Sequence, residues 1–183
     1  MRNSYKKGFV VVMALIAGAF VITSIGPCAA PTKITGSGTI PSAVYNGGKA
    51  HLSFNGDNCG EEVKGQAQYQ DKAFGIKQGG GLKLHAEITE AVDCIEFPNG
   101  DESLLCELCY SLVGSESALA FEYTSTNPNS PGDGTGVVCL SDGGEGNDAE
   151  DFFAIGLLTG PYAGYLNGGL TSGGNIQSHG CDE

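Results

Sequence analysis

The chain has 183 residues with a formal net charge of −12, and 30 of those residues are glycine. Beyond residue 30 it holds six lysines, 21 acidic residues and no arginine, a formal net charge of −15. Proteins bind nucleic acids and phosphate groups through positive fields and arginine forks, so this composition excludes nucleic acid as an expected partner. Glycine in a helix interior costs about 1 kcal/mol relative to alanine, which also argues against a helical bundle.

The N-terminal segment has the pattern of an export signal. Positive residues among the first seven precede a largely apolar run over residues 8–26, the charge order that orients such a signal in the membrane. Pro27 ends any helix there, and small residues follow it. The sequence therefore predicts a signal peptide over residues 1–30, cleaved near Ala30, and one exported domain over residues 31–183.

Two other fates of this leader stay open. Residues 25–28 (Ile-Gly-Pro-Cys) resemble a lipoprotein box, in which Cys28 would be acylated, although Pro27 stands where that box has a small residue. The apolar run also approaches the lower limit of a membrane-spanning helix, roughly 17 residues, so an uncleaved anchor is the third possibility. In each case the domain is expected outside the cytoplasm, secreted or at the cell surface, and it would touch a membrane only through its N-terminal segment.

Alternation of apolar and polar residues predicts short strands through the exported part. It is clearest over residues 49–54, 62–70 and 82–89, where every second residue is apolar or small. Further strands are expected over residues 94–97, 103–113, 118–124, 136–140, 151–158 and 162–166.

Segments rich in Gly, Asn, Asp and Pro separate these strands, as turns do in antiparallel sheets. The predicted fold is all-β, a single antiparallel β-sandwich or flattened barrel that follows an N-terminal signal helix and is stabilised by disulfides. Beyond residue 30 no strong amphipathic helix is expected, and only a short helical turn over residues 117–122 stays open.

An even number of cysteines beyond the leader predicts a disulfide framework in an oxidising compartment. These cysteines are Cys59, Cys94, Cys106, Cys109, Cys139 and Cys181, and the sequence does not choose their pairing.

The pair Cys106-Glu107-Leu108-Cys109 is the closest approach to a redox or metal motif. On the predicted strand over residues 103–113, positions three apart point to opposite faces, so we expect the two sulfurs to bond elsewhere. A redox dithiol requires a helix N-terminus, a zinc site requires a second pair, and haem attachment requires His where Tyr110 stands. Structural disulfides are the prediction, with metal and redox roles as the alternatives.

An acidic loop over residues 142–151 is the candidate ligand site. Calcium binds several carboxylate and carbonyl oxygens on a flexible turn, although the order of acidic residues here does not fit an EF-hand. A solvated loop between strands is the favoured interpretation, and no other cofactor is expected. If calcium binds, its predicted ligands are Asp142, Glu145, Asp148 and Asp151.

The histidines and tyrosines offer weaker candidates. His51, His85 and His179 lack the close spacing of a zinc site, so we expect them at exposed or turn positions. Carbohydrate binding usually uses exposed aromatic rings, which only Tyr162 and Tyr165 beside a glycine-rich turn suggest here. Packing or turn anchoring is the favoured role of both tyrosines.

Short phrases recur in a definite order between residues 34 and 179. They are Gly48-Lys49-Ala50-His51-Leu52-Ser53-Phe54, Gly65-Gln66-Ala67-Gln68-Tyr69-Gln70-Asp71, Leu82-Lys83-Leu84-His85, Asp142-Gly143-Gly144-Glu145-Gly146, Asp151-Phe152-Phe153-Ala154-Ile155 and Gly173-Gly174-Asn175-Ile176-Gln177-Ser178-His179. Together they resemble the post-COAP type of small secreted bacterial domain, from which this chain departs by its six cysteines and an insertion-like stretch over residues 102–109. That family has no established activity, so the resemblance implies fold and location but no mechanism.

These observations predict a non-catalytic structural or interaction domain at the bacterial surface or in the extracellular space, with an unknown partner. A calcium- or carbohydrate-binding module is the alternative. A hydrolase is the remote alternative, because the chain has no serine elbow and no carboxylate pair that stands out from its many acids. The prediction is therefore that the protein is not an enzyme.

Overall fold

The computed structural model describes residues 32–44, 47–75, 81–94, 104–113, 115, 117–144 and 150–181. The predicted signal helix over residues 1–30, with Cys28, lies outside these residues. Within them the fold is nearly all antiparallel β, with nine strands in one sheet and one short helix, which confirms the predicted fold class. The strands are β1 (Thr32–Pro41), β2 (Lys49–Asp57), β3 (Lys64–Asp71), β4 (Leu82–Asp93), β5 (Ser117–Ser125), β6 (Asp133–Ser141), β7 (Phe152–Leu157), β8 (Leu166–Leu170) and β9 (Gly174–Gly180).

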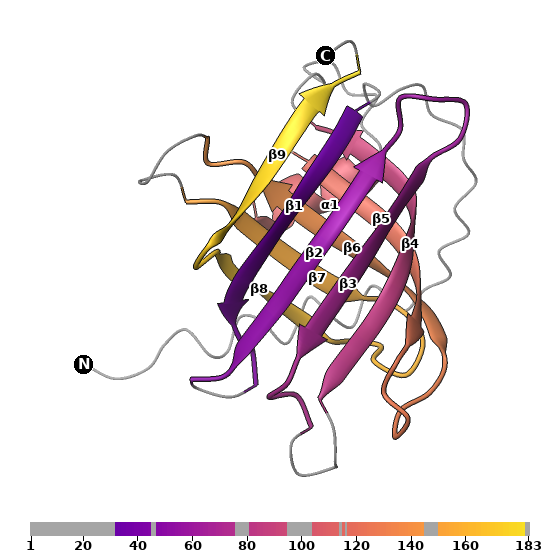
Figure 1. Cartoon of the computed structure of the whole chain (residues 1–183), viewed down its shortest axis with the longest axis vertical. Coiled ribbons are helices and arrows are strands. Elements are labelled where there is room, and N and C mark those ends of the chain that lie inside the picture. The colour runs from indigo at the N-terminus through magenta and orange to yellow at the C-terminus, as the bar shows by residue number, and fades with distance from the viewer. Residues whose placement is uncertain are drawn as a thin grey trace.

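The sheet is a meander whose last strand returns to its first. Its order is β8-β7-β6-β5-β4-β3-β2-β1-β9, and every neighbouring pair is antiparallel. In Figure 1, β9, β1, β2, β3 and β4 lie side by side at the front, and β5 to β8 cross behind them. The sheet thus curls into a half-barrel and wraps one core.

Alternation along the strands builds this core. In β2 the side chains of Ala50, Leu52 and Phe54 are buried, whereas Lys49, His51 and Ser53 face solvent. Because successive strand residues point to opposite faces, each strand sends every second side chain inward. Large inward strand side chains that are at most 7% exposed include Ile34, Phe54, Tyr69, Leu84, Phe121, Tyr123, Phe153 and Ile176.

Glycine inside β6 makes room for the aromatic core. A Cβ atom on Gly136 would lie 2.4 Å from the Phe121 ring, and one on Gly134 would lie 2.7 Å from the Tyr123 ring. Both glycines pair with those aromatic residues across β5 and β6. These glycines therefore serve close packing within a strand as well as turns.

The predicted strand over residues 103–113 is wrong, because these residues form helix α1 (Leu104–Val113). Burial of Leu105, Cys106 and Cys109 follows the i, i+1, i+4 spacing of one helix face, and this face packs on β5 and β6. A stretch that is apolar at most positions fits the periods of both a strand and a helix. In this protein the packing of the buried helix face on the outer side of β5 and β6 favours a helix over a strand.

None of the helices within the described ranges is long and apolar enough to span a membrane.

Other boundaries differ from the predicted ones. Residues 162–164 form a turn, closed by the hydrogen bond from the Gly164 N–H to the Leu157 carbonyl (2.8 Å), so β8 starts at Leu166. Residues 117–122 lie in β5, not in a helical turn. Cys94 directly follows β4, and residues 95–97 lie outside the described set. Neither β1 nor β9 was among the predicted strands, because both are short of bulky apolar residues.

Three disulfides join the six cysteines that were predicted to be bonded. They are Cys59–Cys181, Cys94–Cys106 and Cys109–Cys139. The second and third attach α1 to the end of β4 and to β6, so Cys106 and Cys109 have different partners as predicted, although they lie on a helix and not on a strand. All six sulfurs are therefore bonded in structural bridges.

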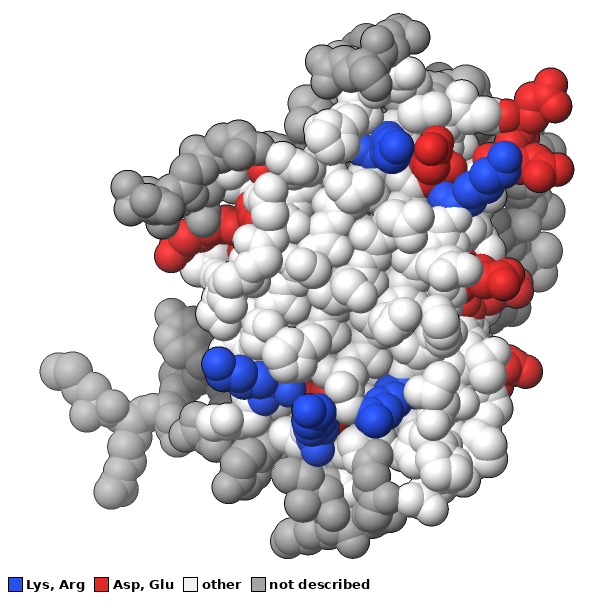
Figure 2. Space-filling model, viewed as in Figure 1, with Lys and Arg blue, Asp and Glu red and all other residues white. Residues whose placement is uncertain are grey.

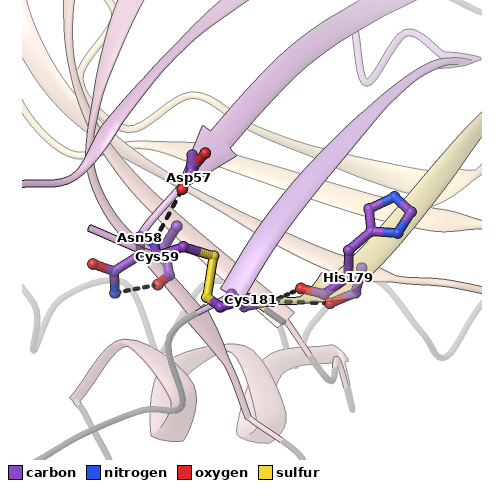
Figure 3. The surroundings of a disulfide bond; sticks show 8 residues. Asp57, Asn58, Cys59, His179 and Cys181 are labelled. Carbon is purple, nitrogen blue, oxygen red and sulfur yellow. Dashed lines mark hydrogen bonds between the residues drawn. A yellow bond between two sulfur atoms is a disulfide. The ribbon is translucent and has the colours of Figure 1, made fainter. Parts of the chain in front are cut away.

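The Cys59–Cys181 bridge fixes the end of β9 to the corner after β2. The Cys59 N–H donates to the Asp57 carboxylate at 3.0 Å (Figure 3). The Asn58 side-chain amide donates to the Ala91 carbonyl at 3.0 Å. The corner is thereby tied both to β9 and to β4. Three intramolecular disulfides are consistent with an extracytoplasmic location.

Candidate functional site

The outer face of β9, β1, β2, β3 and β4 carries an ordered array of polar side chains, which we call the polar face. Strand register places outward residues opposite one another, so their side chains form rows across the sheet, with Cβ atoms about 5 Å apart. The rows are Asn175–Ser37–Ser53–Gln68–His85, Gln177–Thr35–Asn55–Gln66–Glu87 and Thr39–His51–Gln70–Lys83. Except for Glu87 and Lys83 at one border, these rows contain only hydroxyl, amide and imidazole side chains.

A shallow groove of about 540 Å³ runs across this face. Its floor follows the first and third rows, and the glycine turn before β9 and Thr126 after β5 line its ends. The lining side chains that point outward are Ser37, Thr39, His51, Ser53, Gln68, Gln70 and Lys83. Strands lie roughly 4.8 Å apart, so an extended ligand laid across them would meet polar groups at that repeat.

Hydrogen bonds within the face orient some of these groups. The His51 Nδ1 atom lies 2.8 Å from the Thr39 hydroxyl, and the Gln66 N–H donates to the Asn55 side chain at 3.1 Å. His51 and His85 are both exposed, as predicted from the sequence.

Charge is confined to the borders of the polar face. Figure 2 shows the lysine side chains at its two ends and an uncharged area between them. By register, Lys33, Asp57 and Lys64 lie in line at one end. Lys49, at the start of β2, and Lys83, at the start of β4, mark the other.

A buried polar network lies beneath the groove. The Asp71 carboxylate, fully buried, accepts hydrogen bonds from the Ser42 hydroxyl (2.7 Å), the Tyr165 hydroxyl (2.8 Å) and the Ala73 N–H (2.9 Å). Tyr69 and Tyr165 share a hydrogen bond of 2.7 Å, and the Asn167 amide donates to Tyr69 at 3.0 Å. Since Tyr69 and Asp71 alternate with Gln68 and Gln70 along β3, the network holds the strand that supplies part of the groove floor.

Burial perturbs both tyrosines of this network. It raises the pKa of Tyr69 to about 12, against the lowering effect of the hydrogen bonds from Tyr165 and Asn167. Burial also raises the pKa of Tyr165 above its ordinary value, and the neighbouring Tyr69 and Asp71 add to that rise. Both phenols therefore stay protonated through the neutral range.

The structure describes only part of the acidic loop over residues 142–151. Glu145 and Asp148 lie outside the described set, and Asp142 is exposed, with its carboxylate accepting from the Gly144 N–H at 2.7 Å. Asp151 is 4% exposed, and its two carboxylate oxygens accept from the Gly143 N–H (3.0 Å) and the Ile176 N–H (2.7 Å). Asp151 thus connects the β6–β7 loop to β9 and helps to close the open side of the curled sheet.

No cluster of three or more potential metal ligands occurs in the part of the chain that the structure describes. Calcium binding by Asp142, Glu145, Asp148 and Asp151 stays a prediction.

Replacing Asp151 is expected to destabilise the fold far more than replacing Asp142. Asp151→Ala removes two hydrogen bonds to backbone N–H groups, one of them buried at Ile176, and should lower the free energy of unfolding by about 3 kcal/mol. Asp142→Ala, at an exposed turn, should cost less than about 1 kcal/mol. Urea unfolding of both variants without calcium measures the difference, and equal small losses would contradict the structural role of Asp151.

The tyrosines near the glycine-rich turn do not form an exposed aromatic platform. Tyr162 and Tyr165 are 4% and 6% exposed, and each packs edge-on against Phe74. The favoured prediction, that they pack and anchor the turn, is confirmed.

No protein-family model, curated protein or solved structure matches this chain. The resemblance to post-COAP type domains therefore stays a prediction.

The sequence predicted solvent-facing positions for the members of the polar face on β2, β3 and β4, but it predicted neither β1 nor β9 and did not combine these residues into a site. The signal lies in the alternation itself, for example in Gln66, Gln68 and Gln70 on every second position of β3. Which strands are neighbours, and in which register, comes only from the folded sheet.

Proposed function

We propose that this chain is an exported, non-catalytic interaction domain that binds polysaccharide across its polar face. The observation that carries the proposal is the groove over β1 to β4, which is lined by hydroxyl, amide and imidazole groups at the repeat of the strands, with Lys83 at one border. Such groups both donate and accept hydrogen bonds, as the hydroxyl groups of a sugar chain require.

A protein partner fits this face less well. Protein interfaces depend on aromatic, arginine and aliphatic anchors that are desolvated at the centre of the contact. The rows of the polar face have no aromatic or aliphatic side chain that points outward, and the chain has no arginine beyond its leader.

Rigidity of the face supports binding without a large loss of conformational entropy. Each strand of the groove floor, β1 to β4, has a hydrogen-bonded neighbour on both sides, and the buried Asp71 network holds β3 from the inner side. The disulfide at Cys181 fixes β9, which supplies Asn175 and Gln177. A surface that is already ordered retains more of its contact energy on binding.

Affinity electrophoresis of the native, disulfide-bonded protein tests the proposal. The probes are a soluble β-glucan, a xylan and a galactomannan, followed by a polymer of acidic sugars. At least one should retard the protein, and Ser53→Ala/Gln68→Ala, which removes two groups from the centre of the groove, should weaken that retardation at least tenfold.

The matched control is Asn129→Ala/Ser130→Ala, which removes the same kinds of group from the turn between β5 and β6, outside the groove. This variant should bind as the unmodified protein does. If no polysaccharide in the panel retards the protein, or if both double variants lose binding equally, the polar face is not the binding surface.

A further inference from the structure

The lysines are distributed unevenly over this acidic domain. The described lysines all lie in β1 to β4 or in the turn after β3: Lys33, Lys49, Lys64, Lys72 and Lys83. The described residues of α1 and of β5 to β9 contain acidic residues but no lysine. A domain with a formal charge of −15 beyond residue 30 therefore presents its described cations around one face.

The two ends of this face differ in their charge balance. At one end Asp57 pairs in register with both Lys33 and Lys64, so a carboxylate lies between the two cations. At the other end the nearest acid in the sheet is Asp71, which lies across from Ala50 and Leu82. Its carboxylate points inward and is held by Ser42, Tyr165 and the Ala73 N–H.

Lys83 lines this end of the groove, and Lys49 and Lys72 adjoin the paired residues Ala50 and Asp71 at the same end of the sheet. All three lysines are exposed, and Lys83 lies next to Gln70. The outward row of His85 continues through Thr124 to Asp133, two strands beyond β4, where the Asp133 carboxylate accepts a hydrogen bond of 2.8 Å from the Thr124 hydroxyl. One lysine in the groove and two more at the same end of the sheet, beside hydroxyl, amide and imidazole groups, favour a ligand that has both hydroxyl groups and negative charges.

From this arrangement we infer that the polysaccharide bound by the polar face carries carboxylates, as polymers of uronic acids do, and that Lys49, Lys72 and Lys83 bind them. The inference rests on the proposed function. A lysine binds a carboxylate as a point charge, whereas phosphate recognition favours the bidentate fork of arginine. One exposed ion pair contributes little, so a polymer with repeated charges is required.

Two polymers with the same sugar backbone, one with charged and one with neutral carboxyl groups, isolate the contribution of the carboxylate charge to binding. Binding of polygalacturonate is compared with binding of its methyl ester, in which the carboxylates are neutral, at 20 mM and 300 mM salt. Polygalacturonate should bind at least tenfold more tightly at low salt, and the preference should shrink at high salt because exposed charges are screened.

The variant Lys49→Gln/Lys72→Gln/Lys83→Gln should lose this preference, whereas the control Lys33→Gln/Lys64→Gln should keep most of it. Thermal melting of both variants checks that these exposed substitutions leave the fold intact. Equal binding of the acid and the ester would overturn the inference and leave the proposed function standing.

Poly-glutamate supplies carboxylates without sugar. Binding of poly-glutamate as tight as that of polygalacturonate would overturn the inference, because the sugar hydroxyls would then contribute nothing. If none of the sugar polymers binds, including the neutral ones, the proposed function itself is wrong.

Discussion

Removal of the Cys59–Cys181 disulfide is expected to lower the free energy of unfolding by about 5 kcal/mol. This bridge closes a loop with a sequence separation of 122, against 12 for Cys94–Cys106 and 30 for Cys109–Cys139. A longer closed loop restricts the unfolded chain more, so its bridge contributes more stability. Both Cys59 and Cys181 are exposed, so replacing them leaves no hole in the core.

The measurement is urea unfolding of Cys59→Ser/Cys181→Ser beside Cys94→Ala/Cys106→Ala. The loop-entropy relation gives about 3 kcal/mol for the shorter bridge, so the first variant should be the less stable by about 2 kcal/mol. A larger loss from the Cys94–Cys106 pair would show that packing of α1, and not loop closure, determines what these bridges contribute.

Tyr165→Phe is expected to cost about 3 kcal/mol of folding free energy, although it removes a single oxygen atom. The fully buried Asp71 carboxylate would lose a hydrogen bond of 2.8 Å, and the Tyr69 hydroxyl would lose one of 2.7 Å. A hydrogen bond to a carboxylate contributes about 1.5–3 kcal/mol, and a buried acceptor left without a donor adds a desolvation cost.

The matched control is Tyr162→Phe, which removes an equally buried hydroxyl that bonds to Ser125 at 3.0 Å and should cost about 1 kcal/mol. Chemical denaturation at neutral pH compares the two variants. Equal losses of unfolding free energy would show that the hydrogen bond to the Asp71 carboxylate stabilises the fold no more than a hydrogen bond between neutral groups does.

The same network predicts how stability depends on alkaline pH. The pKa of Tyr69 rises to about 12 in the folded protein, and the pKa of Tyr165 also rises, while an unfolded tyrosine titrates near pH ~10. Stabilisation by the protonated phenols is therefore complete below about pH 10 and is lost as the pH rises towards about 12. Tyr165→Phe should flatten this decline in unfolding experiments between about pH 10 and 12.

Several features of this fold follow from short stretches of sequence. Alternation over residues 49–54 and 82–89 predicts strands whose buried and exposed faces agree with β2 and β4. The parity of the cysteines predicts that all six are bonded. Strand alternation is a local property, and the even number of cysteines is a property of the composition. Both can therefore be predicted without knowing which strands are neighbours.

Other features could not be predicted because they depend on distant contacts. Residues 104–113 are apolar at most positions, and only packing on β5 and β6 selects the helix. Asp151 is one of several acids in a polar loop, and its role depends on the Ile176 N–H, 25 residues further along the chain.

The sequence by itself determined the all-β class, the outward position of residues such as Gln68 and His51, and the bonding of the cysteines. Periodicity and composition carry that information, because a strand exposes every second residue wherever it lies. Only the tertiary structure decided which cysteines pair, which strands adjoin and which outward residues share a row. Those depend on register between segments far apart in the chain, and the polar face exists only through that register.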